Sequence, residues 1–424
     1  MEKAVTLSDI TTENIYHCIK CGLCLAHCPV YKEILLEDAS PRGKVQIAKW
    51  INEGNLDLSE EVKQTLFSTC LLCGSCVANC PSGVHGTHLF SGLRWRAIQR
   101  YGIAWKKKVL FQILSRRWMI SPSAWFARWA QKAFDDLRLQ VGALPAHAIP
   151  RLNEVPFSRT VPERVAPVGG TERASILYFH GCATNYLYGD IGRAVVRSLT
   201  HMGVAVRIPR DQICCGLPIF LSGDRAASFT SIRRTLALFA AADADAVIVD
   251  CATCGSALKN EYPHLLREMR ELGDPVTEDD IDAADRLAAK VRDITVFIAE
   301  HEDWLPQLHA IDPPCRVTYH DPCHLAKGQK VSAEPRQLLR AIPGVEFVEM
   351  AGADDCCGGG GSFQIEYADT SAKITNRKIA NIAKTRADIL ATGCPGCNLT
   401  IGAHLEGTDR PTVVHPVQIL ARAL

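Results

Sequence analysis

The chain has 424 residues, enough for roughly two to four domains that each bury a core. Its hydrophobic content of 47% and charged content of 22% are those of an ordinary globular protein. The net charge of +1 argues against nucleic acid as a partner, and no run approaches the ~20 apolar residues that span a bilayer.

Nineteen cysteines are the strongest signal in the composition. Residues 1–10 contain no apolar signal core, and the cysteine count is odd. Disulfide-dense frameworks usually belong to small secreted domains that cannot build a core. Metal binding therefore explains the cysteines better than disulfides, and we expect a cytoplasmic protein.

Residues 1–90 contain two copies of the run C-x2-C-x2-C-x3-C-P, which is typical of bacterial two-cluster ferredoxins. In this pattern the fourth cysteine of each run ligates the cluster of the other run. We therefore expect one [4Fe-4S] cubane on Cys18, Cys21, Cys24 and Cys80, and a second on Cys70, Cys73, Cys76 and Cys28. The segment between the runs includes a helix-compatible stretch, residues 45–52, so the domain is expected to be helical and expanded. A zinc site is the alternative, but closed zinc sites need only four ligands.

Residues 91–172 are expected to connect this domain to the rest of the chain. From 91 to 134 there are ten Lys or Arg, no Asp or Glu, and five of the seven tryptophans: Trp95, Trp105, Trp118, Trp125 and Trp129. A basic, tryptophan-rich amphipathic stretch suits the headgroup layer of an anionic membrane. A docking surface for a partner protein and a plain helical connector are the alternatives. Residues 141–172 are rich in proline and small residues and predict an extended linker.

From residue 173 the pattern becomes α/β and occurs twice, in residues 173–308 and 309–424. In the first copy we expect strands at 176–179, 204–208 and 246–250, and helices at 190–202 and 231–241. In the second we expect strands at 317–320, 345–349 and 387–390, and a helix at 335–341. Residues 295–300 are expected to correspond to residues 413–418. The repeat predicts tandem α/β domains related by a pseudo-twofold axis, with ligands at the loops after the strand ends.

Each copy carries five cysteines at nearly equal spacing: a single one, an adjacent pair before glycine, and a C-x2-C pair. They are Cys182, Cys214, Cys215, Cys251 and Cys254, then Cys323, Cys356, Cys357, Cys394 and Cys397. The gaps are 31 and 35 residues in the first set and 32 and 36 in the second. Thiolates on rigid strand ends and helix N-termini suit an iron–sulfur centre, and five of them exceed what one cubane requires. We expect one or two further [4Fe-4S] clusters here.

These motifs resemble the cysteine-rich-domain family, in which two ferredoxin motifs precede two copies of C-x31-39-CCG-x34-37-C-x2-C. The family includes the iron–sulfur subunits of glycolate and D-lactate oxidases, the anaerobic glycerol-3-phosphate dehydrogenase iron–sulfur subunit and the catalytic subunit of heterodisulfide reductase. The resemblance covers residues 15–90 and 174–424. In heterodisulfide reductases it implies a non-cubane [4Fe-4S] cluster on each five-cysteine set, with the disulfide cleaved between them. Some oxidase subunits have eroded CCG motifs, whereas this chain keeps all ten cysteines.

Several other residues are candidates for roles around the clusters. Cys315 lies outside both sets and is expected to be a buried free thiol. Beside the cluster cysteines, or at a matching strand end, lie His180, His320, His324 and His415. We expect these histidines to donate hydrogen bonds that tune the cluster potentials, with proton relay by His320 and His324 as the alternative. Asp321 and Asp355 either relay protons or cap helices.

The resemblance implies an oxidoreductase subunit. We expect the iron–sulfur electron-transfer subunit of a flavin-linked 2-hydroxyacid (glycolate or D-lactate) dehydrogenase or oxidase. It would pass electrons from an FAD-containing partner towards membrane quinone, with peripheral contact at the inner face of the cytoplasmic membrane. One alternative is a heterodisulfide-reductase-type catalytic subunit that reduces a disulfide at non-cubane clusters. Another is a zinc scaffold without redox function.

Overall fold

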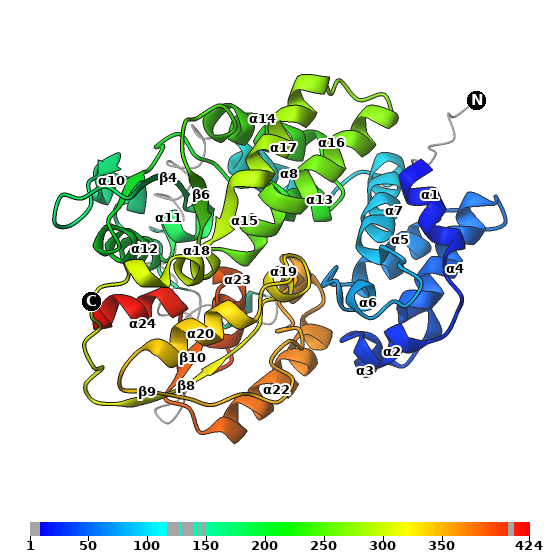
Figure 1. Cartoon of the computed structure of the whole chain (residues 1–424). Coiled ribbons are helices and arrows are strands. Elements are labelled where there is room, and N and C mark those ends of the chain that lie inside the picture. Colours follow the sequence, from blue (N-terminus) through cyan, green and yellow to red (C-terminus); the bar gives the residue numbers. More distant parts are fainter. Residues whose placement is uncertain (1–8, 117–127, 129–139, 142–143, 146–149, 406–410) are drawn as a thin grey trace.

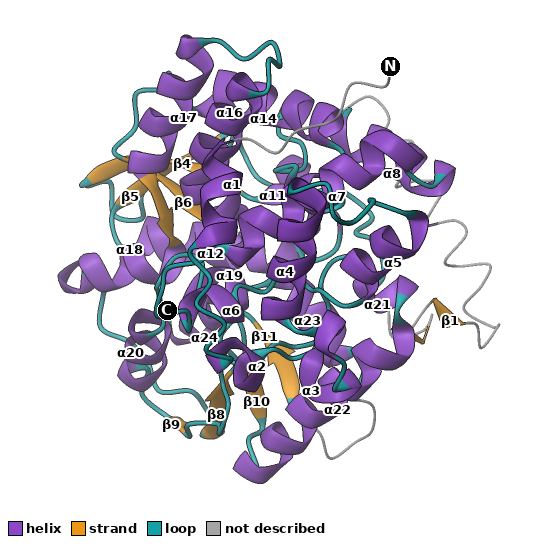
Figure 2. Cartoon of the chain, turned by 90° about the vertical axis from the view of Figure 1, so that its right-hand side faces the viewer, coloured by secondary structure: helices purple, strands orange, loops and turns teal. Residues whose placement is uncertain are grey.

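The structure is a computed structural model that describes residues 9–116, 128, 140–141, 144–145, 150–405 and 411–424 (Figure 1). A group of N-terminal helices, blue in Figure 1, lies beside two α/β units formed by the rest of the chain. The strands of these units form two separate small sheets within a mainly helical molecule (Figure 2). The predicted fold class, a helical ferredoxin-type domain followed by two α/β domains, is confirmed.

The N-terminal domain is built from short helices around the two cysteine runs. Its helices are α1 (Asp9–Tyr16), α2 (Leu23–His27), α3 (Tyr31–Ile34), α4 (Pro41–Asn52), α5 (Glu60–Ser68), α6 (Ser75–Ala78) and α7 (Gly86–Tyr101). Helix α4 begins earlier than the expected residue 45, because Ser40 Oγ accepts a hydrogen bond from the Gly43 amide at 2.9 Å and caps the helix. Helix α7 continues past residue 90, so the expected end of this domain falls inside a helix.

The first α/β unit has a five-stranded sheet. Its strands are β3 (Arg164–Val165), β4 (Ala174–Phe179), β5 (Val204–Arg207), β6 (Ala246–Val249) and β7 (Val291–Asp293), in the order β3-β5-β4-β6-β7. All pairs are parallel except β3–β5. Its helices include α11 (Gly181–Tyr186), α12 (Gly189–His201), α13 (Leu217–Leu221), α14 (Arg225–Phe239), α15 (Ala252–Ser256), α16 (Tyr262–Glu271), α17 (Glu278–Lys290) and α18 (Ile294–Glu300).

The second α/β unit repeats this topology. Its strands are β8 (Cys315–Tyr319), β9 (Val345–Phe347), β10 (Ile389–Ala391) and β11 (Thr412–Val414), and all pairs are parallel. The order β9-β8-β10-β11 matches the order β5-β4-β6-β7 of the first unit. Its helices are α19 (Cys323–Ala326), α20 (Ala333–Ala341), α21 (Phe363–Glu366), α22 (Ala368–Thr385), α23 (Pro395–Gly402) and α24 (Pro416–Ala423). The two units are therefore tandem copies, and every strand predicted in them is present.

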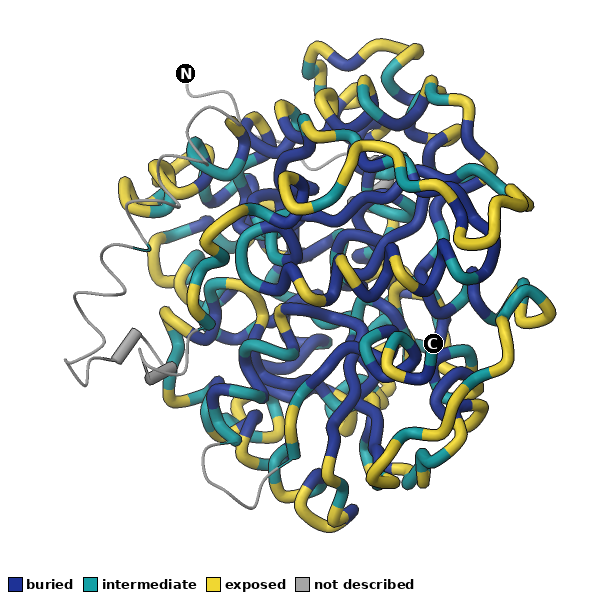
Figure 3. Tube along the Cα trace, turned by 90° about the vertical axis from the view of Figure 1, so that its left-hand side faces the viewer, coloured by how far each residue is buried: buried dark blue, intermediate teal, exposed yellow. Residues whose placement is uncertain are grey.

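The copies pack against each other reciprocally. Helix α12 of the first packs on α24 of the second, and the corresponding pair, α20 and α18, packs on the other side. One apolar cluster runs through both copies, from Ile176 and Ile248 to Val317 and Ile389. Figure 3 shows buried chain through the interior of the molecule and exposed chain mainly at its periphery. Reciprocal contacts of this kind are what a pseudo-twofold axis produces.

The ends of the two copies correspond in a different register from the predicted one. Residues 295–300 lie in helix α18, whereas residues 413–414 lie in strand β11. The structure instead pairs Asp293 with His415, because each lies at the end of the last strand of its copy and caps the following helix through its side chain. The predicted match of 295–300 with 413–418 was therefore wrong by four residues.

The expected connector, residues 91–172, is only partly a linker. Its described part includes helix α8 (Trp105–Ser115), the pairing strands β1 (Gln140–Val141) and β2 (Leu144–Pro145), and helix α10 (Phe157–Thr160). Phe157 is fully buried in the shared core, and β3 extends the first sheet. Phe157 and β3 belong to the first α/β unit, because they complete its core and its sheet. This unit therefore starts before residue 173.

Candidate functional site

The eight cysteines of the ferredoxin-type runs lie around two small cavities. The first, of about 40 Å³, is lined by Cys18, Cys21, Cys24 and Cys80, with Cys76 also at its wall. The second, of about 20 Å³, is lined by Cys28, Cys70, Cys73 and Cys76. The fourth cysteine of each run therefore lies beside the first three of the other run, which is the arrangement of the expected crossover.

Backbone amides and a buried lysine favour thiolates around these cavities. The amides of Tyr31, Leu72 and Val84 donate to the sulfurs of Cys28, Cys70 and Cys80 at 3.4, 3.4 and 3.3 Å. Lys44 is 1% exposed and donates to the Ala39 carbonyl. Hydrogen bonds and positive charge stabilise the anionic form that ligates metal. Burial acts in the opposite direction and outweighs them, so that the pKa of Cys28 is raised to about 11. Bound iron would supply the missing positive charge.

The ten cysteines of the two α/β copies line a single cavity of about 340 Å³. Each single cysteine, adjacent pair and C-x2-C pair follows the carboxyl end of a strand, β4, β5 and β6 in the first copy and β8, β9 and β10 in the second. The parallel sheets thus carry both sets to one edge each. The cavity is much larger than the two ferredoxin-type cavities, of about 40 and 20 Å³.

The two sets face each other across the interface between the copies. Helix α15 meets α19, and the equivalent helices α23 and α11 also meet. The Ala252 amide donates to the Gly393 carbonyl at 2.9 Å, and Thr253 Oγ1 lies 3.6 Å from Cys394 Sγ. The pseudo-twofold axis therefore brings the C-x2-C pairs together from opposite sides.

The glycine after each adjacent pair is required by its backbone conformation. Gly216 has φ 81° and Gly358 has φ 91°, both in the left-handed region that side chains disfavour. A Cβ at Gly358 would also lie 2.5 Å from Thr375 Oγ1. This turn directs the amide of each glycine to the first sulfur of its pair, Cys214 at 3.5 Å and Cys356 at 3.4 Å.

The thiols of each set are crowded enough to share protons. Cys357 Sγ lies 3.3 Å from Cys397 Sγ. In both copies the pKa of the second cysteine of the adjacent pair, Cys215 or Cys357, is well below its usual value, because of its hydrogen bonds with the adjacent cysteine and with the last cysteine of the set. The hydrogen bond with Cys357 conversely raises the pKa of Cys356 to about 12. Such a donor set suits bound iron, which would neutralise several converging thiolates.

The ferredoxin-type domain contacts the second set more directly than the first. The Cys73 and Cys356 side chains are in hydrogen-bonding contact, which together with burial raises the pKa of Cys73. Lys327 Nζ donates to Ser75 Oγ at 2.8 Å and to the Asp354 carbonyl at 2.7 Å. Burial opposes the charge of Lys327, but nearby Cys73 and Asp354 outweigh it and raise its pKa.

The contact with the first copy is made by side chains of α7. Trp95 is buried, and the Arg225 guanidinium lies 4.0 Å from its ring centre. Arg225 also forms a buried ion pair with Glu268, at 2.7 Å. Arg94 donates to the carbonyls of Cys70 and Leu221. Trp95 is therefore not available for the predicted membrane contact of residues 91–134, because α7 lies between two domains. Trp118, Trp125 and Trp129 lie outside the described residues.

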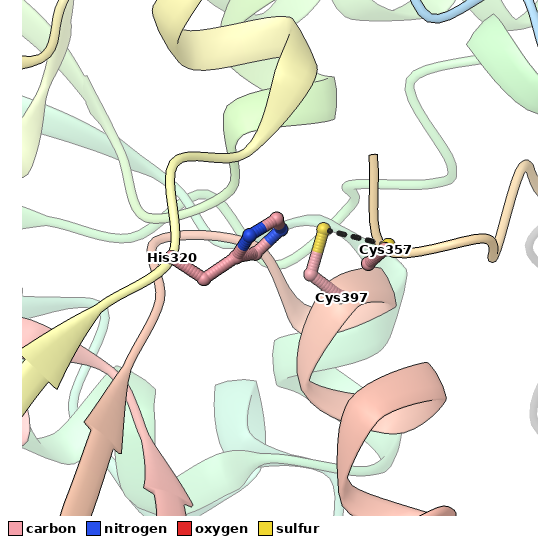
Figure 4. A group of neighbouring side chains, drawn as sticks. All are labelled: His320, Cys357 and Cys397. Carbon is pink, nitrogen blue, oxygen red and sulfur yellow. Dashed lines mark hydrogen bonds between the residues drawn. The ribbon is translucent and has the colours of Figure 1, made fainter. Parts of the chain in front are cut away.

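Four candidate histidines are buried or half-buried, and burial lowers the pKa of each. The rings of His180, His320 and His415 each have a buried Nε2 without a partner. His320 Nε2 or Nδ1 forms, with the sulfurs of Cys357 and Cys397, a group whose atoms all lie within 4.8 Å of one another (Figure 4). His324 Nδ1 instead lies 3.1 Å from Thr253 Oγ1, across the interface between the copies.

The remaining candidates do not lie in the cavity. Asp321 forms an ion pair with Arg336, at 2.6 Å, and caps no helix. Asp355 lies 4.0 Å from Lys32 at the domain boundary. Cys315 is half-buried at the start of β8, the opposite end of that strand from Cys323, rather than fully buried as expected.

Sequence reasoning missed the buried cations beside the cysteines. These are Lys44, Lys327 and Lys378, which is 1% exposed and donates to the Gly352 and Ala353 carbonyls. Only Lys327 carried a local signal, because it lies one helical turn after Cys323. In the described parts of the chain, no helix is both long and apolar enough to span a membrane.

Comparison with known proteins agrees with this geometry. A model of a cysteine-rich domain matches residues 176–259 and 317–402, and a model of a 4Fe-4S dicluster domain matches residues 14–84.

The chain is 31% identical to the probable glycolate oxidase iron-sulfur subunit of Bacillus subtilis, over 97% of this chain and 94% of that protein. It is 29% identical to a subunit of the CoM/CoB fumarate reductase of Methanothermobacter marburgensis, over 93% of this chain and 68% of that protein. It is 33% identical to lactate utilization protein A of Geobacillus kaustophilus, over 57% of this chain and 96% of that protein. The chain therefore belongs to the family of iron–sulfur oxidoreductase subunits that includes the glycolate oxidase type, with a 4Fe-4S dicluster domain and two cysteine-rich domains.

Proposed function

We propose that this chain is the iron–sulfur electron-transfer subunit of a flavin-linked glycolate or D-lactate dehydrogenase. The observation that carries this proposal is one continuous series of cysteine sets, from the surface of the ferredoxin-type domain to the cavity between the cysteine-rich domains. The names of the relatives from Bacillus subtilis and Geobacillus kaustophilus support the two substrates. An FAD-containing partner would oxidise the substrate and donate the electrons.

The ligand assignment is part of this proposal. One [4Fe-4S] cubane would be held by Cys18, Cys21, Cys24 and Cys80, and a second by Cys70, Cys73, Cys76 and Cys28. Each five-cysteine set would hold a further [4Fe-4S] cluster, and the excess of thiolates over one cubane favours a non-cubane form. When bound, these clusters would accept and pass single electrons.

The direction of transfer follows from exposure and contact. Cys21 is exposed, so the first cavity is accessible to a donor protein. The second cavity adjoins the first, since Cys76 lines both. Because Cys73 contacts Cys356, electrons would leave the ferredoxin-type domain through the second five-cysteine set.

Helix α8 supports delivery to quinone at a membrane surface. Its exposed face carries Trp105 and Leu110, 71% and 49% exposed, beside Lys106 and Lys108. Exposed apolar and basic side chains on one helix suit the headgroup layer of an anionic membrane. We expect the variant Trp105→Ala/Leu110→Ala to cosediment less with anionic vesicles than the unmodified chain, whereas equal binding would remove this support.

Reconstitution with the flavoprotein tests the main proposal. The full chain, purified without oxygen, is expected to contain iron and acid-labile sulfide. Glycolate or D-lactate should bleach its visible absorbance only when the FAD-containing protein is added. Substrate oxidation by the chain alone with its own bound FAD, or zinc without sulfide, would overturn the proposal.

A second candidate function is disulfide reduction of the heterodisulfide reductase type. It is favoured by one observation, that all ten cysteines line one cavity large enough to hold more than a cubane-sized group. The relative from Methanothermobacter marburgensis, part of a CoM/CoB fumarate reductase, supports thiol chemistry at such a site. Turnover of a disulfide by the chemically reduced chain, without any flavoprotein, would favour this function over the first.

A further inference from the structure

His320 is the one candidate histidine that the described structure groups with two cluster cysteines. It follows strand β8 and is 1% exposed, so water does not compete for its ring nitrogens. Its ring points towards the sulfur of Cys397, with the sulfur of Cys357 just beyond (Figure 4). These two cysteines belong to the adjacent pair and the C-x2-C pair of the second set.

The hydrogen bonds of His320 determine which ring nitrogen is available. Nδ1 lies 3.1 Å from the Ala353 carbonyl oxygen, which can only accept, so Nδ1 carries the proton. Nε2 is buried without a partner and therefore presents its lone pair. Burial of the ring and the nearby ammonium of Lys378 both disfavour a second proton on it. In this tautomer Nε2 has no proton to donate, so it can bind only through its lone pair.

This arrangement is the one that metal-ligating histidines adopt. Their second ring N–H is usually held by a carbonyl or carboxylate, which fixes the tautomer and the ring orientation. The Ala353 carbonyl has this role here, and it also accepts from Lys378 Nζ at 3.1 Å. Leaving the Nε2 lone pair buried and unbonded costs free energy unless a ligand occupies it.

The equivalent histidine of the first copy differs. His180 Nδ1 likewise lies beside a carbonyl, that of Gly181 at 2.8 Å, and its Nε2 also has no partner. Its ring packs edge-on against Phe157 and Tyr178. Among the described residues, however, His180 belongs to no group of three converging donors. The chain thus supplies an internal control at a matching position.

We propose that His320 Nε2 is a ligand of the iron bound by Cys357 and Cys397, so that the second cysteine-rich domain holds a centre with mixed sulfur and nitrogen ligands. Neutral imidazole donates its lone pair, and no proton is released. A neutral ligand leaves the centre less negative than a further thiolate would. This inference rests on the proposed function, because it requires an iron–sulfur centre on the second set.

Isotope labelling and pulsed electron paramagnetic resonance test the proposal. The full chain is purified without oxygen from cells fed natural or 15N-labelled histidine. In a paramagnetic state of the second set we expect a strongly coupled nitrogen whose frequencies change with the label. The coupling should be lost in His320→Gln and retained in His180→Gln, at equal iron content. Loss in His180→Gln, or no strongly coupled histidine nitrogen in the iron-loaded unmodified chain, would overturn the proposal.

A second variant covers a His320→Gln protein that folds poorly or binds less iron. His320→Cys replaces nitrogen with a thiolate at the same position. We expect it to regain iron and sulfide without regaining the nitrogen coupling, and a persistent histidine coupling in this variant would contradict the assignment. Zinc without acid-labile sulfide in the unmodified chain would instead mean that the proposed function has failed.

Discussion

Lys327 Nζ donates a hydrogen bond to Ser75 Oγ at 2.8 Å, across the boundary between the ferredoxin-type domain and the second cysteine-rich domain. Ser75 Oγ in turn accepts from Cys73 Sγ at 3.4 Å. Lys327 follows helix α19, which begins at Cys323. One ammonium group therefore connects a cysteine of the second ferredoxin-type cavity with the helix that carries the first cysteine of the second set.

Removing this charge should make the neighbouring centres harder to reduce. At a separation of roughly 7 Å and an effective dielectric constant near 20, a unit charge is worth about 2 kcal/mol to each added electron. We expect Lys327→Met to lower the reduction potentials of the centres on both sides by more than a tenfold change in equilibrium constant, about 59 mV for one electron. Potentiometric titration followed by electron paramagnetic resonance measures this shift.

Two further variants separate charge from structure at this boundary. Lys327→Arg keeps the charge and Ser75→Ala removes only the hydrogen-bond partner, so both should retain potentials near those of the unmodified chain. Lys384→Gln removes an exposed charge on α22 and controls for net charge. Equal shifts in Lys327→Met and Lys384→Gln would show that the position of Lys327 has no special effect.

The crossover of the ferredoxin-type runs predicts that two serine variants each lose the cluster of the other run. Cys80→Ser should eliminate the centre at the cavity lined by Cys18, Cys21 and Cys24, although Cys80 belongs to the other run. Cys28→Ser should eliminate the other cubane. Spin quantification on each reduced variant assigns the lost signal, and a reversed assignment would mean that each run ligates its own cluster.

The buried Arg225–Glu268 pair should stabilise the first cysteine-rich domain at the place where α7 packs on it. The two side chains are 3% and 2% exposed, and Trp95 covers the guanidinium. Glu268→Gln leaves a buried charge uncompensated and is expected to lower the free energy of unfolding by about 3–5 kcal/mol.

The Arg267–Asp285 pair gives a matched control, because both partners are 45% exposed. Asp285→Asn is expected to cost no more than about 1 kcal/mol. Thermal or denaturant unfolding under anaerobic conditions compares the two variants. Similar losses would mean that burial gives the Arg225 pair no special weight.

Asp293 makes stability depend on pH. Burial raises its pKa from 3.8 to about 6, although its hydrogen bonds with Thr295 oppose this. A raised pKa means that the folded state binds the proton more tightly than the unfolded state does. Protonated Asp293 therefore contributes to the free energy of unfolding in full below pH ~3.8, and this contribution is lost as pH rises through about 6. Asp293→Asn should remove up to about 3 kcal/mol of the change in the free energy of unfolding across this pH range, measured by denaturant unfolding at several pH values. An unchanged slope would contradict the assignment.

The local pattern along the chain determined the fold class and the cysteine sets. The strands at 176–179 and 246–250 could be predicted because a buried parallel strand is a short apolar run. The second of these strands is followed directly by Cys251, which places that cysteine at the strand end. The ferredoxin-type crossover could be inferred because it depends on spacing within each run. The boundaries at residues 90 and 173 could not, because α7 and Phe157 belong to neighbouring domains through contacts that periodicity does not encode.

Only the tertiary structure decided how the cysteine sets relate to one another. The sequence contains two equivalent five-cysteine sets, and nothing in their spacing places one nearer the ferredoxin-type domain. The pseudo-twofold packing brings both to a single cavity, and docking of the N-terminal helices then makes them unequal, because Cys356 contacts Cys73 and the first set has no such neighbour among the described residues. Buried charges such as Lys327, and the lone pair of His320, acquire their roles only from this packing, since their nearest partners lie far away along the chain.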